Sequence, residues 1–250
     1  MGTSTPSAPA RSGPRSPPPT PDAPLGAPLF LLNLKLYEAW LGPRAEEIGR
    51  ALEGAAEHHG VAAALAPSTP DVGRLALTLK VPILGQHADF GPAGARTGYV
   101  VPEGLRAAGA RGALVNHSEH PLSVEEVGWT VGRLAGMGLT AVVCAKDAAH
   151  AAVLAQFRPP YLAVEPPDLI GGKRSVSTAR PEVVRDAVAA VHAVAPGTRV
   201  LCGAGVHTRE DVALALELGS EGVLVASAVT RAPDPAKALD ELLSGYPKAR

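Results

Sequence analysis

The feature that most constrains the fold is a repeated alternation of two kinds of segment. Short apolar runs of four or five residues recur along the chain, and an amphipathic segment or a polar loop follows each one. Apolar runs without strict polar alternation are typical of parallel strands that are buried on both faces. The pattern predicts eight strands, over residues 29–32, 61–65, 81–84, 112–115, 140–144, 160–164, 199–202 and 221–225.

The segments between these runs carry helix signals. Pro43 stands at the start of a segment with helical spacing, and Gly60 stands at its end, as is common at helix termini. Ser123 with Glu126 matches a capping box. The predicted helices cover residues 43–59, 69–79, 102–108, 123–137, 147–156, 181–194, 208–219 and 236–243.

The number of these units selects the architecture. Eight strand–helix units in about 220 residues match an α/β protein of the (β/α)8 barrel type. A doubly wound open sheet uses the same unit, but Asn33, Leu34 and Lys35 follow the first strand where its glycine-rich fingerprint would be needed. The sequence therefore favours a barrel, with residues 28–250 as one domain.

The N-terminus has a different composition. Residues 1–27 are rich in Pro, Ser, Thr, Ala and Gly, which cannot bury a core, so we expect a disordered Pro-rich N-terminal tail. The tail lacks the apolar centre of a signal peptide. A solvated tail is preferred to a docking motif.

Charge and cysteine usage narrow the function classes. The net charge is -1 without a basic block, so we expect no nucleic-acid partner. No apolar run approaches membrane-spanning length, so we expect no membrane partner. Cys144 and Cys202 are isolated and lack metal-ligand spacing. This predicts a cytoplasmic protein in a reducing environment, without a metal.

Polar residues follow several predicted strands at their carboxyl ends, where such barrels build their active sites. Asn33 and Lys35 follow the first strand, His117 follows the fourth and Glu165 follows the sixth. A carboxylate can remove a proton from a carbon beside a carbonyl, and an imidazole can polarise the carbonyl oxygen. Glu165 and His117 therefore predict proton transfer on a carbonyl compound.

Small residues follow the last two strands. Gly203 and Gly205 come after the seventh, and Ala226 and Ser227 come after the eighth. A single Gly-x-Gly is also typical of any tight turn, but small residues at both positions indicate the usual phosphate site of this fold. Lys35 could add a positive charge, so we expect a phosphorylated substrate.

The segment after the sixth predicted strand has the pattern of a lid, a loop that closes over an active site. Glu165 is followed by two prolines, which stiffen the start of the loop, and Gly171 and Gly172 supply a pliant joint at its end. The alternative for this segment alone is a surface glutamate in an ordinary Pro/Gly loop.

These motifs together resemble triosephosphate isomerase, and in particular its short archaeal-type branch. The resemblance covers the chain from Leu29 onward and places a TIM barrel there. Five segments in order carry it: Asn33-Leu34-Lys35, Gln86-His87-Ala88-Asp89, Asn116-His117-Ser118-Glu119, Val164-Glu165-Pro166-Pro167-Asp168-Leu169-Ile170-Gly171 and Cys202-Gly203-Ala204-Gly205.

The resemblance implies interconversion of dihydroxyacetone phosphate and D-glyceraldehyde 3-phosphate through an enediolate. It assigns Glu165 as the base, His117 as the electrophile and Lys35 as the group that offsets negative charge. It also implies no cofactor, no metal, and a homo-oligomer, either a dimer or a tetramer. The substrate-binding residues implied are Asn33, Lys35, Glu119, Ile170, Gly171, Gly205, Ala226 and Ser227.

Three departures from the family pattern leave alternatives open. His120-Pro121 stands where two arginines are usual, Gly172-Lys173-Arg174 alters the lid hinge, and Ala228 replaces a common glycine. One alternative is an isomerase of a larger sugar phosphate, such as a tetrulose phosphate. The other is an inactive phosphate-binding barrel, although the joint presence of the four polar site residues argues against it.

Overall fold

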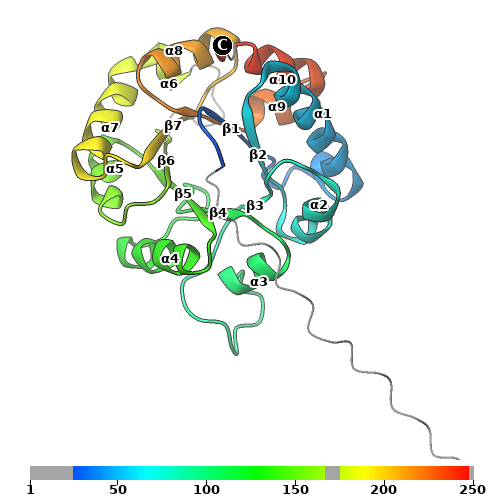
Figure 1. Cartoon of the computed structure of the whole chain (residues 1–250), viewed down its shortest axis with the longest axis vertical. Helices are drawn as coiled ribbons and strands as arrows, with labels where there is room; N and C mark the ends of the chain where they lie inside the picture. The colour runs from blue at the N-terminus through cyan, green and yellow to red at the C-terminus, as the bar shows by residue number, and fades with distance from the viewer. Residues whose placement is uncertain (1–24, 167–174, 248–250) are drawn as a thin grey trace, which may run out of the picture.

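The computed structural model describes residues 25–166 and 175–247, so residues 1–24 of the expected tail over residues 1–27 lie outside this part. Eight parallel strands surround a common axis and helices surround the strands (Figure 1). The strands are β1 (Leu29–Asn33), β2 (Ala62–Ala66), β3 (Leu84–Gly85), β4 (Gly112–Val115), β5 (Thr140–Ala145), β6 (Tyr161–Val164), β7 (Arg199–Gly203) and β8 (Gly222–Val225).

Strand pairing settles the choice between a barrel and an open sheet. β1 pairs in parallel with both β2 and β8, so the first and last strands are neighbours. The remaining strands follow in chain order from β3 to β8. A single bridge between Leu65 and Ile83 joins β2 to the β3 side. The sheet is thus a nearly closed (β/α)8 barrel, as predicted.

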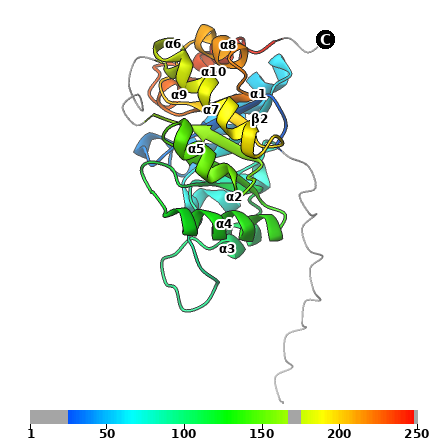
Figure 2. The ribbon, with the colours of Figure 1, turned by 90° about the vertical axis from the view of Figure 1, so that its left-hand side faces the viewer.

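Helices form the outer layer, as the side view shows (Figure 2). The α-helices are α1 (Pro43–His59), α2 (Val72–Thr78), α3 (Pro102–Ala107), α4 (Val124–Gly136), α5 (Ala148–Ala155), α6 (Val176–Ala179), α7 (Pro181–Val194), α8 (Arg209–Glu217), α9 (Ser227–Thr230) and α10 (Pro235–Leu243). Two 3-10 turns are η1 (Glu38–Trp40) and η2 (Thr69–Asp71). None of the helices in the described part of the chain is both long and apolar enough to cross a membrane.

Local capping explains several helix limits. α1 ends at Gly60, whose φ of 67° is left-handed, a conformation that glycine adopts without a steric penalty. The Ser123 side chain accepts from the amide of Glu126, and the Glu126 carboxylate accepts from the Ser123 amide. This confirms the predicted capping box at the start of α4.

The structure corrects the third strand and adds short helices. The expected strand over residues 81–84 is reduced to Leu84–Gly85. Pro82 has no amide hydrogen to give to a neighbouring strand, and it contributes only its carbonyl, which accepts from Leu65 at 3.0 Å. The sequence did not predict η1, α6 or α9, which are only three or four residues long.

Two layers of apolar side chains make up the core. Leu29 and Leu31 of β1 point into the barrel, whereas Phe30 and Leu32 pack against the helices, and all four are fully buried. This burial of both faces explains the absence of polar alternation in the strands. Leu25, which the sequence assigned to the tail, is also buried against the barrel interior.

Candidate active site

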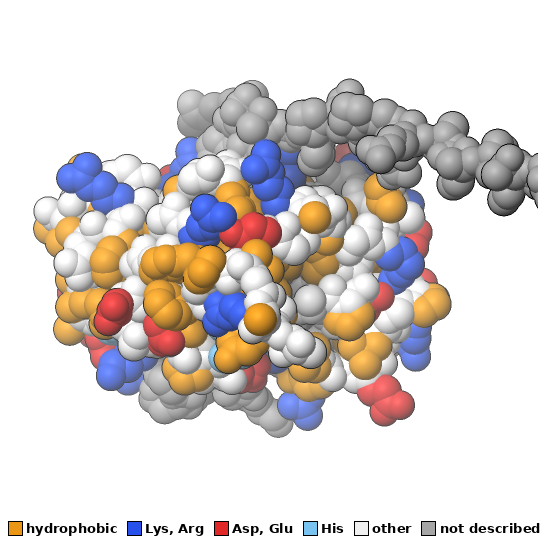
Figure 3. Space-filling view, turned by 90° about the horizontal axis from the view of Figure 1, so that it is seen from below, with side chains coloured by type: hydrophobic (Ala, Val, Ile, Leu, Met, Phe, Trp, Pro, Cys, Tyr) orange, Lys and Arg blue, Asp and Glu red, His pale blue; other side chains and the backbone are white. Residues whose placement is uncertain are grey.

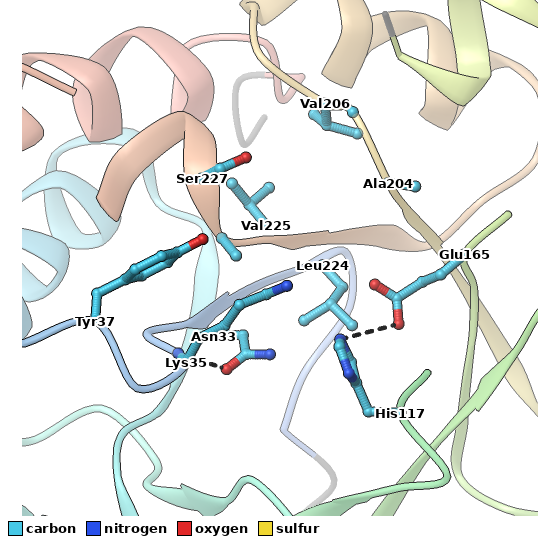
Figure 4. A pocket seen from close by; sticks show the side chains of 12 residues that line it. Asn33, Lys35, Tyr37, His117, Glu165, Ala204, Val206, Leu224, Val225 and Ser227 are labelled. Atoms are coloured by element: carbon cyan, nitrogen blue, oxygen red, sulfur yellow. Dashed lines mark hydrogen bonds and ion pairs between the residues drawn. The ribbon is translucent and has the colours of Figure 1, made fainter. Parts of the chain in front are cut away.

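A pocket opens at the carboxyl ends of the strands, and five strands supply its polar and small residues (Figure 4). It is lined by Asn33, Lys35, Tyr37, His117, Glu165, Ala204, Gly205, Val206, Leu224, Val225, Ala226 and Ser227. Parallel strands in a barrel end on one side, which brings residues from distant parts of the sequence to one place.

Glu165 lies directly after β6 and is buried. Its amide donates to the carbonyl of Ala145 at 2.8 Å, which holds the start of the loop against β5. A Cβ atom on Gly203 would lie 2.4 Å from Glu165 Cγ, so only glycine at this position leaves room for the carboxylate. Glu165 Oε2 has no hydrogen-bond partner. A buried, unpartnered carboxylate oxygen is well suited to accept a proton.

The carboxylate has a protonated neighbour. Burial raises the pKa of the Cys144 thiol well above its usual value of 9.0, and the charge of Glu165 raises it further. Cys144 therefore remains a neutral thiol and adds no second negative charge beside Glu165.

His117 is held in a bent turn after β4. The preceding residue, Asn116, has a left-handed φ of 63°. Its side chain donates to the Cys144 carbonyl at 2.9 Å and accepts from the Leu122 amide at 2.8 Å. These two bonds fasten the turn at both ends.

A hydrogen bond determines which nitrogen of His117 carries the proton. Nδ1 accepts from the Glu119 amide at 3.2 Å, so the proton of the neutral imidazole lies on Nε2. Nε2 faces the pocket, 3.8 Å from Glu165 Oε2. The imidazole thus presents an N–H donor beside the carboxylate.

Lys35 has a strained backbone that its neighbours support. Its φ is 52°; its amide donates to Asn33 Oδ1 at 2.9 Å, and Gln86 Nε2 donates to its carbonyl at 2.8 Å. Lys35 Nζ pairs with Glu119 Oε1 at 2.5 Å. Asn33 and Gln86 therefore hold the Lys35 backbone, and Glu119 holds its charge at the pocket edge.

The turns after β7 and β8 make another side of the pocket. Ala204 and Gly205 have consecutive left-handed φ values of 70° and 71°. Ala226 precedes the short helix α9, which begins at Ser227. A helix start leaves its first backbone N–H groups without helical partners, and successive N–H groups in bent turns form concave anion sites.

The structure brings most of the predicted residues together. Asn33, Lys35, His117, Glu165, Gly205, Ala226 and Ser227 all line the pocket. Glu119 does not; its side chain is 57% exposed and pairs with Lys35 from outside. Ile170 and Gly171, with the rest of the expected lid from 167 to 174, lie outside the described residues.

Sequence reasoning assigned no role to two residues at this site and a different role to a third. Gln86 supports the Lys35 backbone and Tyr37 lines the pocket. Gly203, which the sequence placed at the phosphate site, does not line the pocket and instead makes room for Glu165. Gln86 and Gly203 stand at or just beyond strand ends, which was the available signal. Tyr37 lies in a loop and carried no signal.

This arrangement can transfer a proton between two adjacent carbon atoms of a substrate. His117 polarises an oxygen on one of these carbons, and the turns after β7 and β8 hold an anionic group. Comparisons with known proteins agree with this chemistry. The family model for triosephosphate isomerase matches residues 28–242.

Several archaeal proteins are similar over most of their length. The triosephosphate isomerase of Cenarchaeum symbiosum is 47% identical over 86% of this chain and 96% of its own. That of Methanosarcina acetivorans is 43% identical over 88% and 99%, and that of Methanothermus fervidus is 41% identical over 87% and 98%. The chain therefore belongs to the triosephosphate isomerase family.

Proposed function

We propose that this chain interconverts dihydroxyacetone phosphate and D-glyceraldehyde 3-phosphate. The observation that carries the proposal is the pair formed by His117 Nε2 and Glu165 Oε2, 3.8 Å apart in one pocket. A base and a hydrogen-bond donor at this separation can act on a carbon and its neighbouring oxygen at the same time.

The substrate phosphate binds at the turns after β7 and β8. The left-handed turn at Ala204 and Gly205 and the start of α9 at Ser227 support this placement, because both can direct backbone N–H groups at an anion. Lys35 follows β1, which neighbours β8 in the sheet, and supplies the positive charge. In this orientation the three-carbon chain lies against both Glu165 and His117, so that one can reach a carbon and the other its oxygen.

In the first step, Glu165 removes a proton from the carbon beside the carbonyl. The electron pair of the broken C–H bond forms the carbon–carbon double bond, and the carbonyl oxygen gains negative charge. His117 stabilises that oxygen through its Nε2–H. The positive charge of Lys35 favours the enediolate, because opposite charges stabilise each other more strongly beside protein than in bulk water.

In the second step, the protonated Glu165 returns the proton to the adjacent carbon. His117 moves a proton between the two substrate oxygens, so the carbonyl and hydroxyl exchange places. Hydrogen and electrons stay within the substrate, and the reaction needs no external oxidant. Ile170 and Gly171, outside the described residues, would bind the phosphate through their backbone. Glu119 would hold Lys35 until substrate competes for its charge.

We also propose a cytoplasmic homo-oligomer, a dimer or a tetramer. Two free, buried cysteines are compatible with a reducing compartment. The loop between β3 and α3 extends away from the barrel (Figures 1 and 2), and exposed apolar side chains include Leu36 and Tyr99, which are 70% and 54% exposed. Apolar side chains also lie among charged ones on the face near α3 and α4 (Figure 3). Exposed apolar side chains favour association between chains. Light scattering after gel filtration measures the mass of the particle and so tests the oligomeric state.

A coupled assay tests the function. The purified chain receives dihydroxyacetone phosphate, glyceraldehyde 3-phosphate or a four-carbon ketose phosphate, with His117→Gln as the matched low-activity control. We expect the highest kcat/KM with the triose phosphates. A higher value with the four-carbon substrate would indicate a different sugar-phosphate isomerase, and no turnover with any of them would indicate a binding protein.

A further inference from the structure

A group of metal-binding side chains lies outside the pocket lining. His87 comes from the loop after β3, with Asp89 two residues further, and His120 comes from the turn after β4. One ligand atom from each of the three lies within 4.8 Å of the others. The reaction described above uses none of them.

Two of the three side chains are already set for coordination. His87 Nε2 lies 3.3 Å from Asp89 Oδ1. This separation matches the edge of a tetrahedron of ligands placed about 2.0–2.1 Å from a zinc ion, which is roughly 3.3–3.4 Å. Asp89 Oδ2 accepts from the Val100 amide at 2.6 Å, which fixes the carboxylate with Oδ1 toward His87. Outer hydrogen bonds of this kind are typical of metal ligands.

His120 completes the set through a rotation of its ring. Its imidazole stacks on that of His87, with centroids 3.6 Å apart and planes at 7°. A metal lies in the plane of each imidazole that binds it, so stacked rings cannot share an ion until one of them turns. His120 is exposed and can turn, while its amide donates to the His117 carbonyl at 2.8 Å and keeps its backbone in place.

The group is open to solvent on one side. His87, Asp89 and His120 line a hollow of about 360 Å³, which Asn33, Lys35 and His117 of the pocket also border. An ion therefore has a route in, and water has room to fill a fourth coordination position.

We propose that His87, Asp89 and His120 bind one zinc-class transition-metal ion, which takes no part in the isomerisation. Two imidazoles and one carboxylate suit zinc and its neighbours, whereas calcium and magnesium prefer all-oxygen sites. The ion ties the loop after β3 to the turn after β4. Its binding therefore stabilises the folded chain.

A second histidine group in the described residues supplies a matched control. His58, His59 and Asp240 also lie within 4.8 Å of one another. His58 and His59 are consecutive on α1, so their side chains diverge by about 100° around the helix. Their rings meet at 85°, and His59 Nε2 lies 2.8 Å from Asp240 Oδ1, closer than the roughly 3.3–3.4 Å that separates two ligands of one zinc ion. We assign no site to this group.

The test is zinc titration of the full chain by calorimetry after removal of bound metal with a chelator. We expect one strong Zn²⁺ site per chain. His120→Ala should weaken it at least tenfold, since it removes one of three ligands, and His59→Ala should leave it unchanged. Because His120 is exposed and outside the pocket lining, His120→Ala should keep its turnover in metal-free buffer.

Two further measurements test the same proposal independently of the calorimetry. Zn²⁺ should raise the Tm of the wild type and of His59→Ala but not that of His120→Ala, since a ligand stabilises the state that binds it. Co²⁺ should give the visible absorption of tetrahedral coordination in the first two proteins. Equal zinc affinity in the wild type and His120→Ala, or loss of the site in His59→Ala alone, would overturn the proposal.

Discussion

The two ends of the barrel are built on different physical terms. Among the described residues, three of the four non-glycine residues with left-handed φ lie at the carboxyl end of the strands: Lys35 at 52°, Asn116 at 63° and Ala204 at 70°. The fourth, Arg158 at 49°, precedes β6. This conformation is unfavourable for residues with a side chain by roughly 1–2 kcal/mol each. Each of the three lies at or beside the pocket, where hydrogen bonds or neighbouring turns keep the backbone in place.

At the amino end of the strands, tyrosine hydroxyl groups form complete hydrogen bonds in mostly apolar surroundings. The Tyr161 hydroxyl donates to the Gly26 carbonyl at 2.7 Å and accepts from Arg199 at 3.0 Å. The Tyr246 hydroxyl donates to the Leu29 carbonyl at 2.8 Å. These bonds join the chain before β1 and the segment after α10 to the start of the barrel.

This difference shows that the residues that take part in the reaction lie at one end of the sheet, whereas hydrogen bonds that stabilise the fold lie at the other end. Groups that must change partners during a reaction cannot all be satisfied in the resting protein, and Glu165 Oε2 is an example. The amino end has no such demand. Substitutions at the two ends should therefore affect different measurements.

His117→Gln should give the largest change. Glutamine can still donate a hydrogen bond, but it cannot move a proton between the substrate oxygens. Turnover should fall by about 10²–10⁴-fold, the usual range for a positioned acid–base group, while Tm stays nearly constant. Steady-state kinetics and thermal unfolding measure the two effects. Wild-type turnover in this variant would remove His117 from the mechanism and weaken the contrast between the ends.

Glu165→Asp should give the next largest change. The carboxylate remains, but its reach shortens by about 1 Å, and misplacement by that distance can reduce turnover on the order of 10²-fold. Binding of a phosphate analogue should change little, because the turns after β7 and β8 hold the phosphate. A large loss of binding with a small loss of turnover would make Glu165 a structural anchor instead of the base.

Asp71 tests the comparison between the two ends of the barrel, because it lies on the carboxyl side but outside the pocket lining. Burial alone raises the pKa of Asp71, but hydrogen bonds from Ser68, Arg74 and a backbone amide outweigh it and hold the pKa below its usual 3.8. A lowered pKa stabilises the fold above the unfolded-state pKa, and this stabilisation is lost as the pH falls through the folded-state pKa.

Asp71→Asn should therefore reduce the free energy of unfolding at pH 7 by about 1.5–3 kcal/mol, as expected for bonds to a charged group. Its difference from the wild type should shrink as the pH approaches 3. Urea unfolding at several pH values, with turnover at pH 7 as the control, tests this. A difference that is independent of pH would contradict the role of the charge.

Tyr246→Phe should give the smallest change. It removes the hydroxyl that bonds to Leu29 and keeps the ring, which packs edge-on against Phe30. The free energy of unfolding should fall by about 1 kcal/mol, the net value of one hydrogen bond, and kcat should not change. A fall in kcat without loss of stability would show that the two ends are coupled.

Much of the fold could be predicted because its signals are local. The limits of α7 (Pro181–Val194) match the prediction, and the Ser123 capping box lies where the sequence placed it. Both depend on residues a few positions apart, which interact whatever the rest of the chain does. The third strand was overextended because its pairing with β2 depends on a distant neighbour, Leu65.

The sequence by itself determined which residues reach the carboxyl ends of the strands, because a parallel barrel brings every strand end to one side. Only the tertiary structure decided the distances and hydrogen bonds between these residues. The Nε2 proton of His117 and its distance to Glu165 depend on how the turns after β4 and β6 are bent. The pairing of Lys35 with Glu119 joins residues 84 positions apart. Such contacts arise only when distant segments pack together, and short-range periodicity carries no record of them.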